Sequence, residues 1–411
     1  MAFVISTGRC VRTRQQTQRR TREVRCAADI SSDIVIVGGG IGGLTSAVAL
    51  KKATGRSVTV LERLGGAASG GGVSIALYPN GWKVLDALDK ELAEELRVGT
   101  VAVENGKLMR SDGQVLKKWQ FGDAWKDFEL RAVLRSKLTG SLLRLARELG
   151  VEMLYDKQVE KVNEQSGLLE TADGTQIEGK VIVGADGIGS KIRALTLADG
   201  PAKMSSLIAF RGVADLNHEA APEAMQVWGK SSATRFGSVP ITPSSMYWFV
   251  TTEGSIRRGV EKVDMTEPLR LTKGFPDEVR DILNSSEFAF QSGLADRNPT
   301  LNCGAGRVTL LGDALHPMFP HLGQGGAAAM EDGLALGAAL QNIADDNLLV
   351  DGLRKYERSR LTRNSALQLR SRAVSKVVHW NSPLPALVLP KLFIPALVFR
   401  HCKYTAPIQF A

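Results

Sequence analysis

Three glycines, Gly38, Gly40 and Gly43, follow the apolar run 34–37 and stand at the start of a helix-like segment. Gly38 permits a tight turn, Gly40 lets a ligand approach the backbone, and Gly43 lets the helix pack on the strand. The unpaired N–H groups of such a helix N-terminus attract phosphate. Glu62 ends the next apolar strand, where its carboxylate can accept hydrogen bonds from the hydroxyls of a ribose. This spacing predicts a dinucleotide-binding unit rather than a glycine-rich packing turn.

Two further acidic residues stand at the ends of buried strands. Asp186-Gly187 follows the apolar residues 180–185. Taken alone, this pair is equally typical of a strand-to-helix turn that Ser190 caps. Asp313 follows the strand-like run 307–312. A carboxylate at that place can accept a hydrogen bond from a hydroxyl of a sugar-like chain. The sequence therefore places three polar turns at strand ends.

A glycine-rich segment opens a helix soon after Asp313. A helix that begins near Gln324 has glycines at its N-terminus, so a flat ring system can approach the N–H groups and gain stabilisation of negative charge. This segment contains four adjacent candidate residues: Gly323, Gln324, Gly325 and Gly326. His316 and His321 lie in the same loop, but no carboxylate or cysteine joins them, which favours loop packing over a metal site.

The elements that position these turns alternate along the chain. Strands are expected at 33–37 and 57–62 around a helix at 41–54, and this crossover implies a parallel pair. Helical periodicity covers 80–96 and 138–149, and a long basic helix is expected at 350–378. Short strand-like runs occur at 227–228, 235–239 and 245–251. A strand-rich block is therefore inserted between two segments of one nucleotide-binding layer.

Composition excludes several classes of protein. The chain has 411 residues, 44% of them hydrophobic and 6% aromatic, which is typical of an ordinary globular protein and disfavours a nucleic-acid stacking surface. Four cysteines form no CxxC pair, so neither a zinc site nor a disulfide framework is expected. No uninterrupted run of 18 apolar residues predicts a membrane-spanning helix.

The first 28 residues carry a large part of the net charge of +9. They hold seven arginines and one glutamate, a net charge of +6, which leaves +3 for the rest of the chain. An arginine-rich segment that is poor in acids and has no apolar core is typical of an organelle transit peptide over residues 1–30. We expect a plastid destination, with a mitochondrion as the alternative; a disordered basic tail on a cytosolic protein is the other interpretation.

The order and separation of the three polar turns resemble the FAD-dependent aromatic-ring hydroxylases, the group A flavin monooxygenases, over residues 33–375. Within that family, the run from Asp313 to Asp332 is most similar to the plant and algal branch of zeaxanthin epoxidases and urate-hydroxylase-like enzymes. Zeaxanthin epoxidases usually carry a further forkhead-associated domain, which is not expected here, and Ala327 stands where that branch often has cysteine.

The resemblance implies an α/β fold: a Rossmann-like FAD-binding domain of the GR2 type, an inserted antiparallel β-sheet substrate domain, and C-terminal helices. The implied FAD-binding domain covers 31–110, 130–200 and 300–345. The substrate domain covers 111–129 and 201–299, and a C-terminal helix with an apolar tail covers 346–411.

The resemblance also implies roles for individual residues. Glu62 and the glycine motif hold the adenosine half of FAD, with Arg63 beside them, and Asp313 holds the ribityl chain. Arg135, in an Arg-x-x-Leu segment, contacts FAD, and Asp186 with Gly187 lies near the pyrophosphate and affects NAD(P)H. Arg211 resembles a position that faces the substrate, although a structural strand arginine is an equal alternative.

The implied reaction uses NAD(P)H to reduce tightly bound FAD, and a flavin C4a-hydroperoxide then transfers oxygen to an electron-rich substrate. That substrate is an aromatic, purine or carotenoid-like small molecule. Because no second glycine motif occurs, NAD(P)H is expected to bind transiently. An FAD-dependent reductase of a prenyl substrate and a non-catalytic flavoprotein are the alternatives; a halogenase is disfavoured because the Trp-x-Trp-x-Ile-Pro segment is lacking.

The C-terminal region raises the question of a membrane. Residues 383–399 hold four prolines among apolar residues, so a regular spanning helix is not expected. Next to the basic helix, this segment either rests on an anionic membrane surface or covers the core of its own chain. We therefore expect possible peripheral membrane contact and no nucleic-acid partner.

Overall fold

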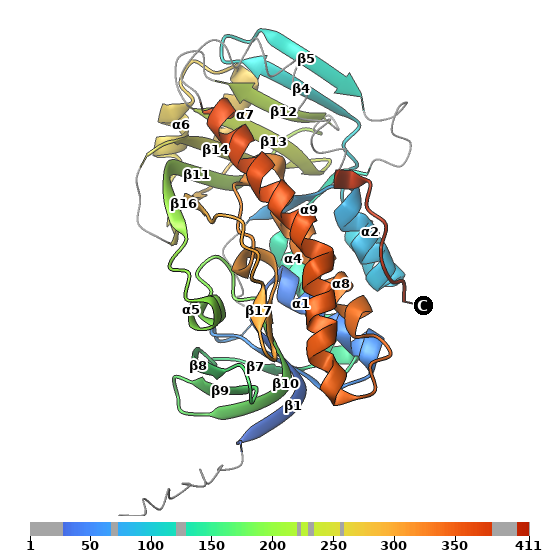
Figure 1. Cartoon of the computed structure of the whole chain (residues 1–411). Helices are drawn as coiled ribbons and strands as arrows, with labels where there is room; N and C mark the ends of the chain where they lie inside the picture. The colour runs from blue at the N-terminus through green and yellow to red at the C-terminus, as the bar shows by residue number, and fades with distance from the viewer. Residues whose placement is uncertain are drawn as a thin grey trace, which may run out of the picture.

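Two β-sheets lie at opposite ends of the molecule, with most of the helices between them (Figure 1). This computed structural model describes residues 28–66, 73–120, 129–219, 223–228, 234–254, 259–379 and 401–410. The predicted fold class is confirmed, because a mainly parallel sheet carries the glycine motif and a largely antiparallel sheet is inserted along the chain. The leader over 1–27 and the apolar segment 383–399 lie outside the described residues.

The first sheet brings the predicted turns to one edge. Its central strands run in parallel in the order β18-β10-β1-β2-β7, with Val37 opposite both Leu61 and Gly184, and Gly184 opposite Leu310. The carboxyl ends of four strands therefore coincide, which is where parallel sheets bind ligands. The strands are β1 (Ile30–Val37), β2 (Val58–Leu61), β7 (Glu152–Leu154), β8 (Val159–Asn163), β9 (Leu168–Thr171), β10 (Gln176–Gly184), β17 (Gly304–Ala305) and β18 (Val308–Leu310).

Two helices pack closely behind this sheet, α1 (Ile41–Thr54) and α8 (Gly325–Leu340). A Cβ atom on Gly333 would lie 2.7 Å from Ser46 Oγ, so α8 can approach α1 only because Gly333 lacks a side chain. The predicted helix at 41–54 is confirmed. The long helix α9 (Leu349–Val378) matches the prediction at 350–378 and runs from the first sheet toward the second (Figure 1).

One predicted helix is wrong in its extent. The periodicity over 80–96 predicts a single helix, but the structure has α2 (Pro79–Leu88) and α3 (Lys90–Arg97). Asp89 separates them because its carboxylate accepts a hydrogen bond of 2.9 Å from the Leu92 N–H and so caps α3. Two further helices flank the first sheet, α4 (Arg135–Glu148) and α5 (Lys191–Leu197).

The second sheet has eight strands in the order β15-β16-β11-β14-β13-β12-β4-β5. Its outer face is apolar and packs on α6 (Thr266–Leu271) and α7 (Asp277–Asn284), with Phe210 and Trp248 in that core. The strands are β4 (Asn105–Arg110), β5 (Val115–Gln120), β11 (Lys203–Asp215), β12 (Glu223–Trp228), β13 (Arg235–Thr242), β14 (Ser245–Glu253), β15 (Val260–Val263) and β16 (Ala289–Asp296).

The inner face of the second sheet looks toward the first sheet. Side chains alternate along a strand, so Ala209 and Arg211 lie on the face opposite to Phe210. Ala209 and Leu207 pack against Phe319, which follows Asp313 along the chain. The loop that leaves the first sheet therefore touches the inner face of the second, and the space between the sheets is the place for a site.

The predicted domain boundary at residue 110 needs a correction. Strand β4 pairs with β5 and β12 of the second sheet, so the inserted block begins before Asn105. The sequence of β4 alone does not reveal which sheet the strand joins, because its pairing partners are set only when the chain folds. A two-stranded sheet, β3 (Ser74–Leu77) with β6 (Arg131–Leu134), lies beside this block. Among the described residues, no helix combines the length and apolar character needed to cross a bilayer.

Candidate functional site

The glycine motif turns sharply after β1 and leaves open space at one position. Gly38 has φ +110°, and a Cβ atom there would lie 2.5 Å from the carbonyl oxygen of Ala185. A Cβ atom on Gly43 would lie 1.9 Å from the Gly38 oxygen, so α1 packs on this turn only without a side chain. A Cβ atom on Gly40 would meet no atom within 4 Å. The backbone at Gly40 therefore borders room for a ligand.

Glu62 directly follows β2 and is bound to the same turn. Its carboxylate accepts hydrogen bonds from the Gly39 N–H at 2.9 Å and the Leu64 N–H at 3.0 Å. The side chain is nearly buried, at 9% exposure, so its orientation is fixed beside the motif. Arg63 is exposed, and no hydrogen bond to this turn is formed by it among the described residues. The structure thus joins Glu62, but not Arg63, to the glycine turn.

Asp186 serves the start of α5. Its carboxylate accepts hydrogen bonds from the N–H groups of Lys191 at 2.7 Å and Ile192 at 3.1 Å, and Ser190 Oγ accepts one from the Arg193 N–H. The strand-to-helix turn capped by Ser190, which the sequence left open, is therefore present. Burial raises the pKa of Asp186 despite these bonds. Gly38 packs against the Asp186 backbone, so this turn also borders the glycine motif.

Arg193 ties the second turn to the third. It is only 1% exposed, and its guanidinium donates to the carbonyl oxygens of Ala314 and Leu315, the two residues that follow Asp313. Asp199 accepts from Arg193 Nε at 3.0 Å and balances its charge. A buried arginine held in this way fixes the position of the Asp313 loop relative to α5. The sequence showed Arg193 but not its partners.

Asp313 lies in the turn after β18. We call the space that Asp313, Arg135, Arg211 and the N-terminus of α8 share the cavity. The Asp313 side chain is accessible to solvent, yet burial among protein atoms raises its pKa, while His316 and Arg135 oppose that shift. Its Oδ1 lies 4.0 Å from the place of a Cβ atom on Gly325, the first residue of α8. The carboxylate and the N-terminus of α8 therefore share one space.

Arg135 begins α4 and faces the same space. Burial lowers its pKa, the nearby Asp313 carboxylate raises it, and the nearby Arg211 guanidinium lowers it. Within the described residues its Nε is covered and has no hydrogen-bond partner. Arg135, Asp313 and Arg211 were separate candidates in the sequence, and the fold brings them within electrostatic reach of one another.

Gln324 immediately precedes α8 and is 1% exposed. Its Oε1 accepts a hydrogen bond of 2.9 Å from Asn80 Nδ2, whereas its own Nε2 has no partner in the described part of the chain. Gly323 adopts φ +62°, and a Cβ atom on Gly326 would lie 2.3 Å from Ile75. The loop is therefore closely packed against Ile75, and the Gln324 Nε2 group remains available as a hydrogen-bond donor.

Arg211 lies on the inner face of the second sheet. Its Nη1 donates to Ser292 Oγ at 2.8 Å, and Tyr247 is within hydrogen-bonding reach. Burial raises the pKa of Tyr247, and the Arg211 charge opposes this shift. Neither partner is a carboxylate, so the guanidinium keeps its charge uncompensated within the described site.

A buried charge cluster lies between α8 and α9, and the sequence analysis missed it. Glu331 and Asp332, both 0% exposed, bind Arg360 at 2.8 and 2.7 Å, and Arg363 binds Glu331 at 2.6 Å. His316 Nε2 lies 2.5 Å from Asp332 Oδ2. The signal was two adjacent acids in an otherwise apolar helix, because buried carboxylates require partners. Asn80 donates to Glu331 as well as to Gln324 and so joins this cluster to the cavity.

The basic helix uses many of its cations inside the protein. Besides Arg360 and Arg363, Arg372 pairs with Asp296 at 2.7 Å and Arg354 with Glu357 at 2.8 Å. The exposed cations of the expected basic face are Lys355, Arg358 and Lys376. The apolar segment that completes the membrane interpretation lies outside the described residues.

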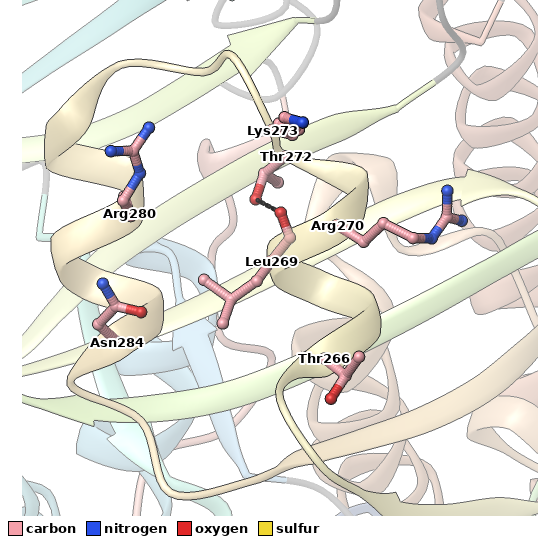
Figure 2. Close-up of a pocket in the computed structure, with 7 residues that line it drawn as sticks. All are labelled: Thr266, Leu269, Arg270, Thr272, Lys273, Arg280 and Asn284. Carbon is pink, nitrogen blue, oxygen red and sulfur yellow. Dashed lines mark hydrogen bonds between the residues drawn. The ribbon is translucent and has the colours of Figure 1, made fainter.

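A surface hollow lies away from these groups, between α6 and α7 on the outer side of the second sheet (Figure 2). Its volume is about 570 Å³, and Arg270, Lys273 and Arg280 line it. Arg270 is already bound by Glu267 at 2.6 and 2.7 Å. None of the polar turns of the first sheet reaches this hollow, so it is not the candidate site.

The residues of the cavity fit FAD. Open space at Gly40 suits a pyrophosphate, and the buried, unbonded donors of Arg135 and Gln324 suit an anionic, acceptor-rich ligand. Glu62 and Asp313 supply acceptors for sugar and ribityl hydroxyls at the two ends of the aligned strand edge. In the described part of the chain, no group of three or more potential ligands is arranged to hold a metal ion.

Comparison with known proteins agrees with this fit. The profile of the FAD binding domain family matches residues 31–371. Chloroplastic zeaxanthin epoxidase of Oryza sativa subsp. japonica is 30% identical over 402 residues, covering 88% of this chain but only 59% of that protein. The 3-hydroxybenzoate 6-hydroxylase of Polaromonas naphthalenivorans is 30% identical over 364 residues, covering 84% of this chain and 88% of that protein.

A solved structure shows the same fold. Klebsiella pneumoniae HpxO, crystallised with FAD and uric acid, superimposes with a TM-score of 0.78 at 22% identity. The superposition covers 91% of this chain and 96% of that chain. The fold is therefore shared with a protein that was crystallised with FAD.

Proposed function

We propose, from the premise that this chain belongs to the family of FAD-dependent monooxygenases that includes 3-hydroxybenzoate 6-hydroxylase and zeaxanthin epoxidase, that it oxygenates an acidic aromatic substrate with NAD(P)H and O2. The family assignment carries the cofactor and the class of reaction. The geometry of the cavity supports the class of substrate.

The observation that carries the proposal is a pair of guanidiniums in one cavity. Arg135 and Arg211 lie close enough to lower the pKa of Arg135, and neither forms an ion pair among the described residues. Both guanidiniums are half-buried, and a partly desolvated charge without a partner destabilises the free protein. Anionic ligands relieve that cost, which supports one anion at the cofactor and another at the substrate.

The chain's own residues would hold FAD along the strand edge. The glycine turn and the N-terminus of α1 would receive the pyrophosphate, Glu62 the ribose, and Asp313 the ribityl chain. When bound, FAD supplies the redox and oxygen chemistry of the reaction. The N-terminus of α8 at Gly325 would stabilise negative charge on the ring.

The inner face of the second sheet would orient the substrate and exclude water. Arg211, with Ser292 and Tyr247 beside it, would bind an acidic group of the substrate. Apolar side chains close the surrounding space and lower its water content, which protects reactive intermediates from hydrolysis. These side chains are Val103, Leu130, Leu207, Ala209, Val239, Leu294 and Phe319.

Arg211 favours an acidic aromatic or purine over a carotenoid. A hydrocarbon chain offers no charge, so its binding would remove water from Arg211 without replacing the lost hydrogen bonds. Uric acid in HpxO and 3-hydroxybenzoate as the substrate named for a relative are both acidic rings. The substrate class therefore follows from an uncompensated cation on the face that borders the cavity.

The test is substrate-stimulated O2 uptake by the FAD-loaded full chain. We expect urate or hydroxybenzoates to stimulate NADH or NADPH oxidation and to acquire ¹⁸O from ¹⁸O2, and we expect the uncharged hydroxybenzamides and zeaxanthin not to do so. Arg211→Gln should raise KM for the acidic ring by about 10- to 100-fold, which corresponds to the loss of a charge-assisted hydrogen bond. Arg280→Gln, on the outer hollow, is the matched control.

Three results would contradict the proposal. Turnover with a prenyl acceptor in the absence of O2 would indicate the reductase alternative. Absence of flavin reduction by either nicotinamide would indicate a non-catalytic flavoprotein. Equal stimulation by charged and uncharged rings would overturn the assigned role of Arg211.

The location of the protein is a separate part of the proposal. The composition of residues 1–30 and the chloroplastic epoxidase relatives support a plastid destination. A fluorescent reporter fused to residues 1–30 should enter plastids; a diffuse cytosolic signal would contradict targeting. Flotation of the full chain with anionic liposomes tests peripheral membrane contact, and failure to float at low salt would contradict it.

A further inference from the structure

The inner face of the second sheet has a group of partly exposed side chains on three adjacent strands. Arg211 and Val213 lie on β11, Tyr247 and Phe249 on β14, and Val239 on β13. The residues that alternate with them along each strand point to the outer face and are buried. Because these three strands lie in the interior of the sheet, solvent reaches the five side chains through space in front of the inner face. We call these five residues the floor.

Strand register places an aromatic ring directly beside Arg211. Phe249 pairs with Arg211 on one side and with Gly237 of β13 on the other. The Tyr247 ring follows on the same face of β14, with its centroid 6.2 Å from that of Phe249 and its plane tilted by 42°. The proposed binding group for the acidic end of the substrate therefore stands next to an apolar aromatic surface.

The Phe249 ring lies over Gly237. A Cβ atom on Gly237 would be 2.3 Å from Phe249 Cζ and 2.6 Å from Cε1, so the tip of the ring occupies the place of a side chain at position 237. The ring therefore extends from β14 toward β13 and away from Arg211. Gly237 is not among the glycines with positive φ, so its backbone does not demand glycine. The close approach of the ring is what requires the absence of a side chain.

The outer face of the same sheet uses glycine in a different way. A Cβ atom on Gly212 would lie 2.4 Å from Trp248 Cζ2, which is the same crowding of a ring on a glycine. Trp248 is 0% exposed and is part of the core beneath α6 and α7. Phe249 is partly exposed, so the side of its ring that faces away from the sheet is open. One glycine serves packing, and the other gives the floor a ring with a free face.

The orientation of Phe249 limits the size of what can bind above it. The distance from β11 to β13 is two strand spacings, or about 9–10 Å. A fused two-ring system held by its acidic group at Arg211 matches this width better than a single ring does. It can also stack on the Phe249 ring in the offset arrangement that aromatic pairs prefer. A side chain at position 237 would push the Phe249 ring off the sheet and into the space that the second ring needs.

We propose that Gly237 and Phe249 determine the size of the substrate: the Phe249 ring, lying over Gly237, is the surface on which a fused two-ring aromatic acid stacks while its acidic group binds Arg211. The inference rests on the proposed function for the anion at Arg211. It narrows the substrate class from acidic aromatic rings to two-ring aromatic acids.

The experiment compares the binding of three acids that differ in their rings. Benzoate, 2-naphthoate and cyclohexanecarboxylate are titrated calorimetrically into the FAD-loaded full chain without NAD(P)H. We expect 2-naphthoate to bind about tenfold or more tighter than benzoate, since the second ring buries further apolar area. We expect benzoate to bind about two- to tenfold tighter than cyclohexanecarboxylate, because only the aromatic ring stacks on Phe249.

Variants at the two positions separate size selection from general apolar binding. Gly237→Ala should lower the affinity for 2-naphthoate by tenfold or more while the benzoate affinity stays within threefold. Phe249→Leu should remove the preference for benzoate over cyclohexanecarboxylate. The double variant Gly237→Ala with Phe249→Leu should bind 2-naphthoate within threefold of Phe249→Leu alone, because the shorter side chain leaves room for the new Cβ atom.

Gly212→Ala is the matched control. It places a Cβ atom equally close to an aromatic ring, but on the outer face. We expect it to lower the stability of the chain and to leave the ratio of the 2-naphthoate and benzoate affinities within twofold of the wild-type ratio. Both acids use Arg211, so the ratio cancels any effect of the substitution on that neighbouring residue.

Four results would overturn the assignment. These are a wild-type chain that binds 2-naphthoate no tighter than benzoate, an equal loss of both acids in Gly237→Ala, no recovery in the double variant, and an unchanged preference for benzoate over cyclohexanecarboxylate in Phe249→Leu. The last of these needs no substitution of the glycine. None requires turnover, so size selection can fail while NAD(P)H-dependent oxygenation of a one-ring acid succeeds. A chain that selects 2-naphthoate as described but never consumes O2 would retain the assignment and lose the proposed reaction.

Discussion

Two regions of this molecule hold arginines away from full solvent exposure and treat them in opposite ways. Between α8 and α9, Arg360 is 4% exposed and lies against the carboxylates of Glu331 and Asp332. In the cavity between the sheets, Arg135 and Arg211 have no carboxylate partner among the described residues. In the first region, carboxylates of the chain itself neutralise the arginine charge. In the second region, the arginine charge is left to be neutralised by an anionic ligand.

The difference shows how burial serves stability in one region and binding in the other. A buried ion cluster strongly resists the loss of one member, because the remaining charge would be left unpaired. A cation without a partner destabilises the free protein and makes an anionic ligand bind more tightly. The predictions below separate these two cases, beginning with the largest expected effect.

Arg360→Ala should cause the largest loss of stability. Removal of the guanidinium leaves Glu331 and Asp332 buried without their main cation, and breaking such a pair costs about 3–5 kcal/mol. Denaturant unfolding of the FAD-free chain measures the change. Arg358→Ala, exposed on the same helix, is the control and should change the unfolding free energy by less than about 0.5 kcal/mol. Equal losses of unfolding free energy in Arg360→Ala and Arg358→Ala would contradict the stabilising role of the buried ion cluster.

Arg135→Gln should have the opposite effects: little change in stability and a clear loss of FAD affinity. Since its guanidinium has no ion-pair partner in the described cavity, we expect unchanged or slightly higher stability of the FAD-free chain. FAD affinity, followed by quenching of flavin fluorescence, should fall by about 10- to 100-fold through loss of a charge-assisted hydrogen bond. A large loss of stability with unchanged FAD affinity would place Arg135 with the structural arginines.

Gly40→Ala tests the open space directly. A Cβ atom at this position meets nothing within 4 Å, and the backbone φ of −77° suits alanine. The FAD-free chain should therefore stay as stable as the wild type within about 0.5 kcal/mol, while FAD affinity falls by about tenfold or more. Gly43→Ala, whose Cβ atom would lie 1.9 Å from the Gly38 oxygen, should instead lose stability. Unchanged FAD affinity in Gly40→Ala would show that the space is not the cofactor's.

Acid should act oppositely on Asp332 and Asp313. The His316 and Arg360 charges keep the pKa of Asp332 well below its usual value, so its stabilisation is present above the unfolded pKa near 3.9 and is lost as the pH falls further. Burial raises the pKa of Asp313, so its ionised form destabilises the FAD-free chain at neutral pH, and that cost disappears as the pH falls through the raised value.

Asp313→Asn should therefore slightly raise the unfolding free energy of the FAD-free chain at pH 7, with a gain that vanishes toward pH 4. Asp332→Asn should lower it at pH 7, and the loss should shrink only at pH values below 4. Unfolding free energies measured from about pH 2 to pH 8 test both statements. A gain for Asp332→Asn or a loss for Asp313→Asn at neutral pH would contradict the comparison.

The sequence predicted the arrangement of the strand-end turns well, because local rules govern it. Gly38, Gly43 and Glu62 lie in one βαβ unit, where close packing of a helix on a strand dictates glycine and strand pairing dictates the edge. Parallel pairing of β10 and β18 with β1 then brings Asp186 and Asp313 to the same edge. Strand order follows general rules for such folds.

Contacts between segments that are distant in the sequence could not be predicted in the same way. Arg235, His321 and His379 come from three distant segments, and nothing in their local sequence indicates that they meet. The cluster at Glu331 is similar, because Asp-Arg and Glu-Arg pairing across 28 to 32 residues depends on how α9 crosses α8. Asp89 ended a helix through a cap that the apolar periodicity hid.

The most direct measurement is an equilibrium titration of the FAD-free chain with FAD, followed by absorbance near 450 nm and by thermal unfolding. The account predicts one FAD per chain and a stabilisation of about 2.7 kcal/mol when free FAD is one hundred times its Kd. Arg135→Gln should need proportionally more FAD for the same stabilisation. A wild-type chain that stays colourless, with an unfolding temperature unaffected by FAD, would contradict the claim that the cavity with the unpaired guanidiniums is a flavin site.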